Sequence, residues 1–291
     1  MGPFVYLGTP EEAVPPLQAL HAAGHEIVLV VTRADARRRR HRPPEPSPVK
    51  VAAQELGLPV SHSLDDVLTC GARRGIVVAF GLIVPSHMLE AVPMVNLHFS
   101  RLPRWRGAAP VERAILAGDT ETAVAVMEME AGLDTGPIHA ERPVTIDPRD
   151  TAESLRERLV AVGTELLIET IEGEMRTEPI RQEGEVIYAQ KITADDRRID
   201  WSATARAIDA QVRIGRAHTT FRGDRFLIWA SEVLPIEVGE PGLLVKRDSK
   251  LLVGAGSGAL ELVEVQPASR PRMSAQAWWN GAQPEGSRLG S

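Results

Sequence analysis

The sequence predicts an α/β fold with a mainly parallel sheet, followed by a smaller domain rich in β-structure. The first observation behind this prediction is that short runs of apolar and β-branched residues alternate with amphipathic helical segments in the first half of the chain. Such runs are typical of strands buried on both faces, and their alternation with helices indicates βαβ units. The second observation is that helical periodicity fades after about residue 175, where Gly and Pro separate short strand-like segments. That pattern is typical of a small barrel or sandwich.

In the first half, five segments are expected to be strands because they are short, apolar and bounded by polar or turn residues. They are Phe4–Leu7, Ile27–Val31, Ile76–Phe80, Met94–His98 and Thr122–Met129. Helices are expected where apolar residues recur at helical spacing. They are Glu11–Ala22, Val49–Leu56, Pro110–Ala117 and a long helix opened by Asp150, for which Glu153 would complete a capping box.

In the second half, a short helix is expected over Thr204–Val212, followed by four short strands. The strands are Phe226–Ala230, Gly242–Val245, Leu251–Val253 and Leu260–Val265. The tail from Asn280 to Ser291 is polar and contains glycine, so we expect it to be frayed. The chain is thus expected to have a first domain over 1–175, a linker over 176–198 and a second domain over 199–291.

Composition excludes several classes of protein. The 291 residues are 43% hydrophobic and 25% charged, as in an ordinary globular protein and unlike a disordered chain, a collagen or a disulfide scaffold. The apolar runs are too short to span a bilayer, and residues 1–25 lack the pattern of a secretory signal. The single cysteine, Cys70, cannot form an internal disulfide, so we expect a cytoplasmic protein. We also expect no membrane association and a monomer. With a net charge of −6, any nucleic-acid partner must be held by a local basic patch.

Asn96 and His98 stand at the end of a predicted strand and form the first candidate for a catalytic pair. Residues i and i+2 of a strand point to the same side, so these side chains project together. The carboxyl ends of strands are where ligands bind in open α/β sheets. An amide supplies a neutral donor, and an imidazole supplies a donor or an acceptor near neutral pH. The pair by itself also fits a polar strand end that only hydrogen-bonds a loop.

Two loops add to this candidate site. Asp134 lies between Gly132 and Gly136, which fits a tight loop that presents a carboxylate, although the same pattern is common in ordinary turns. The segment Ser100–Pro110 directly follows His98 and is basic and rigid. It leads into a predicted helix, and a loop in that position can donate backbone N–H groups to a ligand.

A basic run over Arg33–Arg42 holds six arginines in ten residues and is followed by the proline-rich segment Pro43–Pro48. Such a density of guanidinium groups suits the binding of phosphates. A solvated run of charge with no partner is the alternative. The candidate RNA-binding residues of this run are Arg37, Arg38, Arg39, Arg40 and Arg42.

Taken together, these stretches resemble the signature of the folate-dependent formyltransferases. The resemblance rests on Asn96-Leu97-His98, Ser100–Pro110 and Gly132–Gly136, and extends to Leu7–Pro10, Pro46–Lys50 and Ala79–Pro85. In the second half it extends to Ile199–Ser202, Val265–Ala268 and Met273-Ser274. It covers nearly the whole chain and is closest to the members of the family that act on methionyl-tRNA.

The resemblance implies a Rossmann-like catalytic domain and a C-terminal barrel of the OB type that helps to hold tRNA. The implied donor is 10-formyltetrahydrofolate, the implied acceptor is the α-amine of methionyl initiator tRNA, and no metal is needed. Asn96 and a protonated His98 would donate hydrogen bonds to the formyl oxygen, while Asp134 would orient His98 and help to move the proton that the amine loses. The arginine run would grip the acceptor stem. The implied folate-site residues are Phe80, Gly81, Leu82, Ile83, Val84, Ser100, Arg101, Leu102 and Pro103.

Three positions depart from the family pattern. Glu11-Glu12 stands where an aromatic residue usually follows the opening turn, Arg101 replaces an expected leucine, and Arg37–Arg40 replaces expected glycines. Because of Glu12, a formyltransferase that acts on another acceptor, such as the amine of a nucleotide-linked sugar, remains an alternative hypothesis. A non-catalytic RNA-binding relative is the remaining alternative, and it would require the catalytic constellation to be vestigial.

Overall fold

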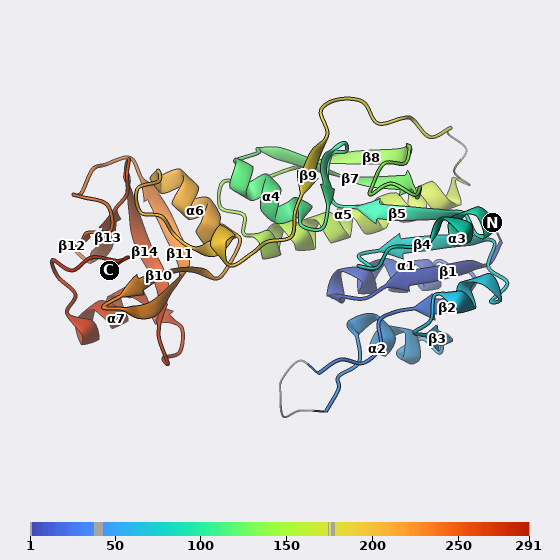
Figure 1. Cartoon of the computed structure of the whole chain (residues 1–291), viewed down its shortest axis with the longest axis horizontal. Coiled ribbons are helices and arrows are strands. Elements are labelled where there is room, and N and C mark those ends of the chain that lie inside the picture. The colour runs from blue at the N-terminus through green and yellow to red at the C-terminus, as the bar shows by residue number, and fades with distance from the viewer. Residues whose placement is uncertain (1, 38–42, 174, 176–177, 291) are drawn as a thin grey trace. The chain divides into compact units, whose positions relative to one another are not determined.

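The computed structural model describes residues 2–37, 43–173, 175 and 178–290 (Figure 1). The chain divides into two compact units, here called the first and second unit. The first unit comprises Met1–Val111, Glu121–Thr145 and Ser154–Gln190, and the second comprises Glu112–Thr120, Ile146–Glu153 and Lys191–Ser291. Among the described residues, none of the helices is both long enough and apolar enough to span a bilayer.

The first unit is built on a seven-stranded sheet with the order β3-β2-β1-β4-β5-β7-β8. Neighbouring strands from β3 to β5 pair in parallel, whereas β7 pairs antiparallel with β5 and β8 pairs antiparallel with β7. This arrangement confirms the predicted α/β fold with a mainly parallel sheet. The strands are β1 (Phe4–Gly8), β2 (Ile27–Val31), β3 (Val60–Ser61), β4 (Arg74–Val78), β5 (Met94–His98), β7 (Glu121–Glu128) and β8 (Ile138–Thr145).

The helices of the first half begin where local sequence signals place them. A 3-10 turn over Glu11–Ala13 leads into α1. Ser47 caps α2 by accepting a hydrogen bond from Lys50 N at 3.0 Å, with a proline at the first helical position. The long helix begins at Ala152, two residues after the Asp150 predicted to open it, and the Asp150 carboxylate accepts a hydrogen bond from Asp147 N at 2.7 Å. The helices are α1 (Val14–Ala22), α2 (Pro48–Glu55), α3 (Ser86–Ala91), α4 (Pro110–Ala117) and α5 (Ala152–Glu172).

A two-stranded sheet inside the first unit was not predicted from the sequence. The loop after His98 contains β6 (Arg104–Gly107), and the predicted linker 176–198 contains β9 (Ile187–Ala189). The two strands pair in parallel, and the N–H groups of Ala108 and Ala109 donate to Ala189 O. Gly107 has φ of +119°, and a Cβ there would lie 3.0 Å from Ala189 O, so the close approach of the two strands requires glycine.

The second unit contains an antiparallel sheet with the order β10-β11-β14-β13-β12, and β15 pairs with β14. This confirms the predicted change to a β-rich C-terminal region. Among the described residues, β10 and β12 do not pair with each other, so the sheet is not shown to be a closed barrel. The elements are α6 (Ala205–Arg213), β10 (Ala217–Phe221), β11 (Asp224–Leu234), β12 (Leu244–Arg247), β13 (Lys250–Gly254), β14 (Ala259–Pro267), β15 (Met273–Ser274) and α7 (Ala275–Ala282).

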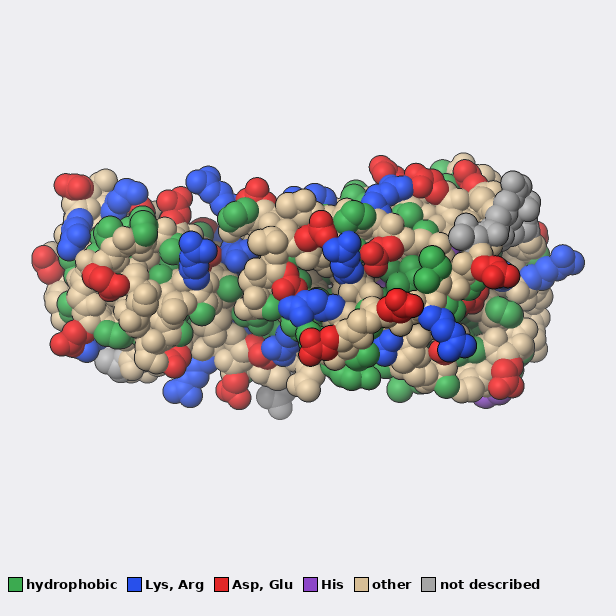
Figure 2. Space-filling view, turned by 90° about the horizontal axis from the view of Figure 1, so that it is seen from above, with side chains coloured by type: hydrophobic (Ala, Val, Ile, Leu, Met, Phe, Trp, Pro, Cys, Tyr) green, Lys and Arg blue, Asp and Glu red, His purple; other side chains and the backbone are tan. Residues whose placement is uncertain are grey.

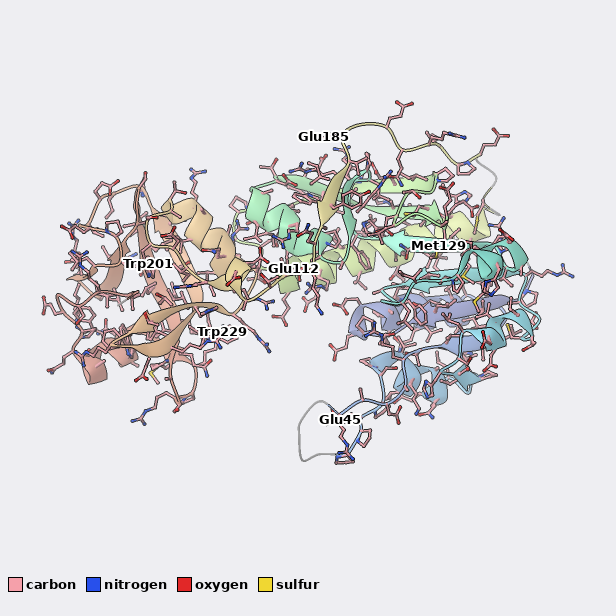
Figure 3. All side chains as sticks on the ribbon, in the orientation of Figure 1. Glu45, Glu112, Met129, Glu185, Trp201 and Trp229 are labelled. Carbon is pink, nitrogen blue, oxygen red and sulfur yellow. The ribbon has the colours of Figure 1, made fainter. Side chains whose placement is uncertain are left out.

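The prediction that the tail after Asn280 is frayed is wrong. Leu289 is only 3% exposed and belongs to the same buried cluster as Trp201, which is labelled in the second unit in Figure 3. Leu289 N donates to Gly242 O, and Gly290 N donates to Thr220 O, both at 2.8 Å. The tail therefore links the end of β10 to the segment before β12. One buried leucine in a polar stretch leaves no periodic signal, so its burial could not be predicted from the sequence.

Candidate functional site

Asn96 and His98 lie on β5, between the parallel strand β4 and the antiparallel strand β7. Both residues are on the same face of the strand, opposite Met127 and Ala125 of β7. His98 is 6% exposed, whereas Asn96 is half-buried. The side-chain amide of Asn96 has no hydrogen-bond partner in the part of the chain that the structure describes. The strand therefore presents one unengaged amide next to a buried imidazole.

The two ring nitrogens of His98 have different surroundings. Nε2 lies 3.1 Å from Trp105 O, and a carbonyl oxygen can only accept, so Nε2 carries a proton and donates. Nδ1 lies 3.8 Å from Asp134 Oδ2. This contact with Trp105 fixes the ring and leaves Nδ1 as the nitrogen that can accept or carry a second proton. Catalytic hydrogen bonds are often long without substrate, so the 3.8 Å separation is compatible with a working pair.

Asp134 is presented by a tight loop, as the flanking glycines predict. Its φ is +52°, and its Oδ2 accepts a hydrogen bond from Gly107 N at 2.8 Å. A Cβ on Gly136 would lie 2.0 Å from Glu128 O, so only glycine lets the loop leave β7 and return into β8 this closely. The structure thus brings the carboxylate of Asp134 to His98 from a distant stretch of chain.

Sequence reasoning missed Gln182, which contacts this loop, and Arg106, which contacts Gln182. Gln182 Nε2 donates to Asp134 O at 2.9 Å and to Gly136 O at 2.8 Å. Gln182 Oε1 accepts from Arg106 Nε at 3.0 Å and from Arg106 Nη2 at 2.7 Å. Arg106 lies in a motif that the sequence analysis singled out, but a glutamine in a polar stretch carries no signal that would have identified it.

The segment after His98 is mostly buried. Ser100 is fully buried, and its Oγ donates to Arg104 O at 2.8 Å. Leu102 packs against Ala125 and Met127 of β7, and Pro103 is also buried. Of the four residues predicted here to contact folate, Arg101 alone is exposed.

Arg101 pairs with two carboxylates although its side chain is 53% exposed. Its Nη1 donates to Glu121, and its Nε lies 3.5 Å from Glu141 Oε1. Burial raises the pKa of the Glu141 carboxyl, while the charge and hydrogen bond of Arg101 oppose that rise. The positive charge that replaces the family's leucine is therefore paired with β7 and β8.

The loop after β4 has a buried base and an exposed apolar tip. Phe80 and Val84 are buried, whereas Gly81, Leu82 and Ile83 are exposed, Ile83 by 87%. Thr9 Oγ1 donates to Phe80 O at 3.2 Å, which ties this loop to the turn after β1. Because β4 and β5 are neighbouring parallel strands, this loop and His98 lie at the same edge of the sheet. An exposed apolar tip of this kind suits a flat ring system.

Of the basic run, only Arg33, Arg37 and the residues between them lie in the described part of the chain. Arg37 is exposed, whereas Arg38, Arg39, Arg40 and Arg42 fall outside the described residues. On the face shown in Figure 2, cationic and anionic side chains are interspersed. A local cluster of arginines, rather than the charge of that face, would have to hold a polyanion.

Glu12, the residue that suggested an alternative acceptor, forms an ion pair inside the first unit. Its Oε1 lies 3.2 Å from Arg156 Nε of α5. Glu12 thus has a structural partner.

Among the described residues, no group of three or more His, Cys, Asp or Glu side chains is arranged to hold a metal ion.

Two family models match the chain. The model described as "Formyl transferase" matches residues 4–171, and the model described as "Formyl transferase, C-terminal domain" matches residues 191–283. The first contains Asn96, His98 and Asp134.

Relatives of known name match over nearly the whole length. "Methionyl-tRNA formyltransferase" of Methylococcus capsulatus is 42% identical over 307 residues, covering 99% of each chain. The solved "Methionyl-tRNA formyltransferase from Clostridium thermocellum" is 16% identical with a TM-score of 0.60, covering 90% of this chain and 99% of that one. An N-formyltransferase from Helicobacter canadensis, solved with folinic acid and dTDP-3-aminofucose, is 18% identical with a TM-score of 0.71, covering 92% and 100%. The two solved structures share the fold of this chain.

Proposed function

The chain belongs to the formyl transferase family, and we propose that it transfers the formyl group of 10-formyltetrahydrofolate to the α-amine of methionyl initiator tRNA. The observation that carries the proposal is the His98–Asp134 pair at 3.8 Å, beside the unengaged amide of Asn96 on the same strand face. The relative at 42% identity, which carries the name of this activity, supports the choice of acceptor.

In this reaction the bond from the acceptor amine to the formyl carbon forms, the bond from that carbon to the folate nitrogen breaks, and one proton passes from the amine to the leaving nitrogen. Asn96 would donate a hydrogen bond to the formyl oxygen while negative charge develops on it. His98 would donate from Nδ1 whenever that nitrogen carries a proton, because Nε2 is committed to Trp105 O. Each donor of this kind contributes roughly 3 kcal/mol to lowering the barrier.

Asp134 would act on His98 and on the proton that the amine loses. Its Oδ2 is already held by Gly107 N, so the carboxylate is oriented before substrate arrives. A preorganised carboxylate 3.8 Å from Nδ1 can attract the protonated ring without taking its hydrogen bond, and it can accept a proton from the attacking amine. In this proposal, Asn96, His98 and Asp134 are the catalytic residues.

The residues around the site have the chemistry that a folate requires. The exposed apolar side chains of Leu82 and Ile83 would contact the ring system, with Phe80 and Val84 fixing the base of the loop and Gly81 giving the backbone access. Ser100, Leu102 and Pro103 would shape the wall of the site from beneath. Arg101 would contribute to the folate site indirectly, because its ion pairs with Glu121 and Glu141 hold this segment in place.

Residues 199–291 and the basic run would bind the tRNA. We assign 1–175 to catalysis, 176–198 to a linker and 199–291 to a tRNA-contacting domain of the OB type. Arg37, with the arginines that follow it, would contact the phosphates of the acceptor stem. Because such contacts release counterions, tRNA affinity should fall steeply with salt. We place this activity in the cytoplasm, in a monomeric protein.

The test is to incubate the full chain with 10-formyltetrahydrofolate and methionyl initiator tRNA and to detect formyl-methionyl-tRNA by mass spectrometry. A parallel reaction contains a nucleotide-linked amino sugar as a competing acceptor. The expected result is formylation of the tRNA alone. Formylation of the sugar in its place would transfer the proposal to the other acceptor class, and no product from either acceptor would reject formyl transfer.

A further inference from the structure

Gln182 lies on the extended segment between α5 and β9, the segment on which Figure 3 labels Glu185. Its two amide N–H groups donate to the backbone carbonyls of Asp134 and Gly136, and its carbonyl oxygen accepts two hydrogen bonds from Arg106. A glutamine amide offers two donors and two acceptor positions. All four are therefore used, at distances between 2.7 and 3.0 Å.

These contacts and the Gly107 N–H surround the catalytic carboxylate of Asp134 with hydrogen-bonded neighbours. Arg106 directly precedes Gly107, whose N–H donates to Asp134 Oδ2. The Asp134 loop is thereby fastened to β6 twice, once through its side chain to Gly107 and once through its backbone to Gln182 and Arg106. Asp134 is a non-glycine residue with positive φ, a strained backbone conformation that persists only where neighbouring contacts hold it.

We propose that Gln182 is a positioning residue for formyl transfer, whose amide holds the Asp134 loop in the geometry that directs the carboxylate at His98. This inference rests on the proposed function. Gln182 acts through Asp134. Loss of its amide would allow the loop to move, and a displacement of about 1 Å at a catalytic group can cost about 10²-fold in rate.

The chemistry of the position requires an amide. A glutamate at 182 would keep an acceptor for Arg106 but would place a carboxylate oxygen against two carbonyl oxygens. Gln182→Glu is thus nearly isosteric and selectively removes the two bonds to the loop. The segment itself has other attachments, because Ile180 exchanges two backbone hydrogen bonds with Ile138 and β9 pairs with β6. The variant should therefore fold.

The second unit offers a matched control. Gln211 Nε2 also donates to two backbone carbonyls, those of Asp196 and Arg198, each at 3.1 Å. Gln211→Glu makes the same chemical change at a glutamine whose two carbonyl partners lie outside the Asp134 loop.

The first measurement is the rate of formyl transfer by the full chain at saturating 10-formyltetrahydrofolate and methionyl initiator tRNA. We expect Gln182→Glu to lower kcat by about 10²-fold, with the KM values for folate and tRNA and the melting temperature close to those of the wild type. Gln211→Glu should retain the wild-type kcat. An unchanged kcat in Gln182→Glu overturns the inference, as does a loss that is shared by both KM values and the melting temperature.

The second measurement is hydrogen exchange at the Gly107 amide, which reports the contact to Asp134 without reference to activity. Exchange should be faster in Gln182→Glu than in the wild type and unchanged in Gln211→Glu. Equal protection of Gly107 in all three proteins overturns the inference. If the wild-type chain forms no formylated product but Gly107 exchange responds as expected, the proposed function has failed while the loop contact itself stands.

Discussion

Two aspartates, one in each unit, show how differently the same side chain is used in the two regions. Asp209 on α6 accepts from Ser231 Oγ at 2.8 Å and from Arg213 Nε at 3.1 Å, so each of its two oxygens has a partner. Burial raises the pKa of Asp209, and these two hydrogen bonds counter that rise. The carboxylate joins α6 to β11.

Asp134 in the first unit is only partly satisfied. Its Oδ2 accepts from Gly107 N, while Oδ1 accepts no hydrogen bond from the described residues, and the nearest ionisable partner is His98 Nδ1 at 3.8 Å. A carboxylate with all of its partners in place stabilises a fold, whereas one that is held on one side only can still act on a ligand. This contrast supports the proposal that the first unit carries the catalytic residues.

The largest expected effect comes from making the same substitution at each of the two compared aspartates. Asp134→Asn should lower the rate of formyl transfer by about 10²- to 10⁴-fold, because the variant cannot accept the amine proton or balance the charge of the imidazolium. The same change at Asp209 should leave the rate unaltered. The rate is measured as formyl-methionyl-tRNA formed under saturating conditions, with filter binding to show that both variants retain tRNA. Equal losses of rate in the two variants would contradict the distinction.

A smaller effect is expected when the second unit loses a contact of its tail. Leu289→Ala should lower the free energy of unfolding of this unit by about 2–4 kcal/mol, because the side chain is buried and its removal leaves a cavity. Val263→Ala on β14 is the control, since Val263 is 42% exposed. Urea unfolding followed by tryptophan fluorescence measures both. A Leu289 variant as stable as the Val263 variant would show that the tail is dispensable.

The smallest effect concerns an ion pair of the second unit and its dependence on pH. Arg113 Nη1 lies 2.7 Å from Asp196 Oδ1, and this guanidinium, together with two hydrogen bonds from Thr193, lowers the pKa of Asp196 from 3.8 to about 2. Since the folded state holds the carboxylate charged, the stabilisation is fully present above pH 3.8 and is lost as the pH falls through about 2. The pair is partly solvated, so its contribution is at most about 1 kcal/mol.

Asp196→Asn provides the measurement for this ion pair. The difference in free energy of unfolding between the variant and the wild type should be constant from pH 7 to about pH 4 and should shrink at lower pH. A difference that stays constant down to pH 2 would show that the charge of Asp196 makes no contribution.

Much of the first half of the chain could be predicted from the sequence because its signals are local. The bounds of β2, β5 and α4 match the predicted segments. A short apolar run marks a strand, and a proline at the first helical position marks the start of a helix, without reference to the rest of the chain. The flanking glycines predicted the tight loop of Asp134. In contrast, β6 and β9 were missed because neither has a pattern of its own, and each is a strand only through its partner.

The candidate site shows the same division. Asn96, His98 and Asp134 could be named from residue type, spacing and the family resemblance. The contact of Gln182 with the Asp134 loop could not, because a glutamine has no distinctive pattern and its partners lie far away in the chain.

The sequence by itself determined the class of fold, the strands of the parallel sheet and the types of side chain available for chemistry, because hydrophobic periodicity and turn residues act over a few neighbouring positions. Only the tertiary structure decided which nitrogen of His98 is free, what holds Asp134 in place, that Arg101 pairs with Glu121 and Glu141, and that the tail is buried at Leu289. Each of these outcomes depends on a hydrogen bond, an ion pair or a packing contact between residues distant in sequence, and no local pattern encodes such a contact.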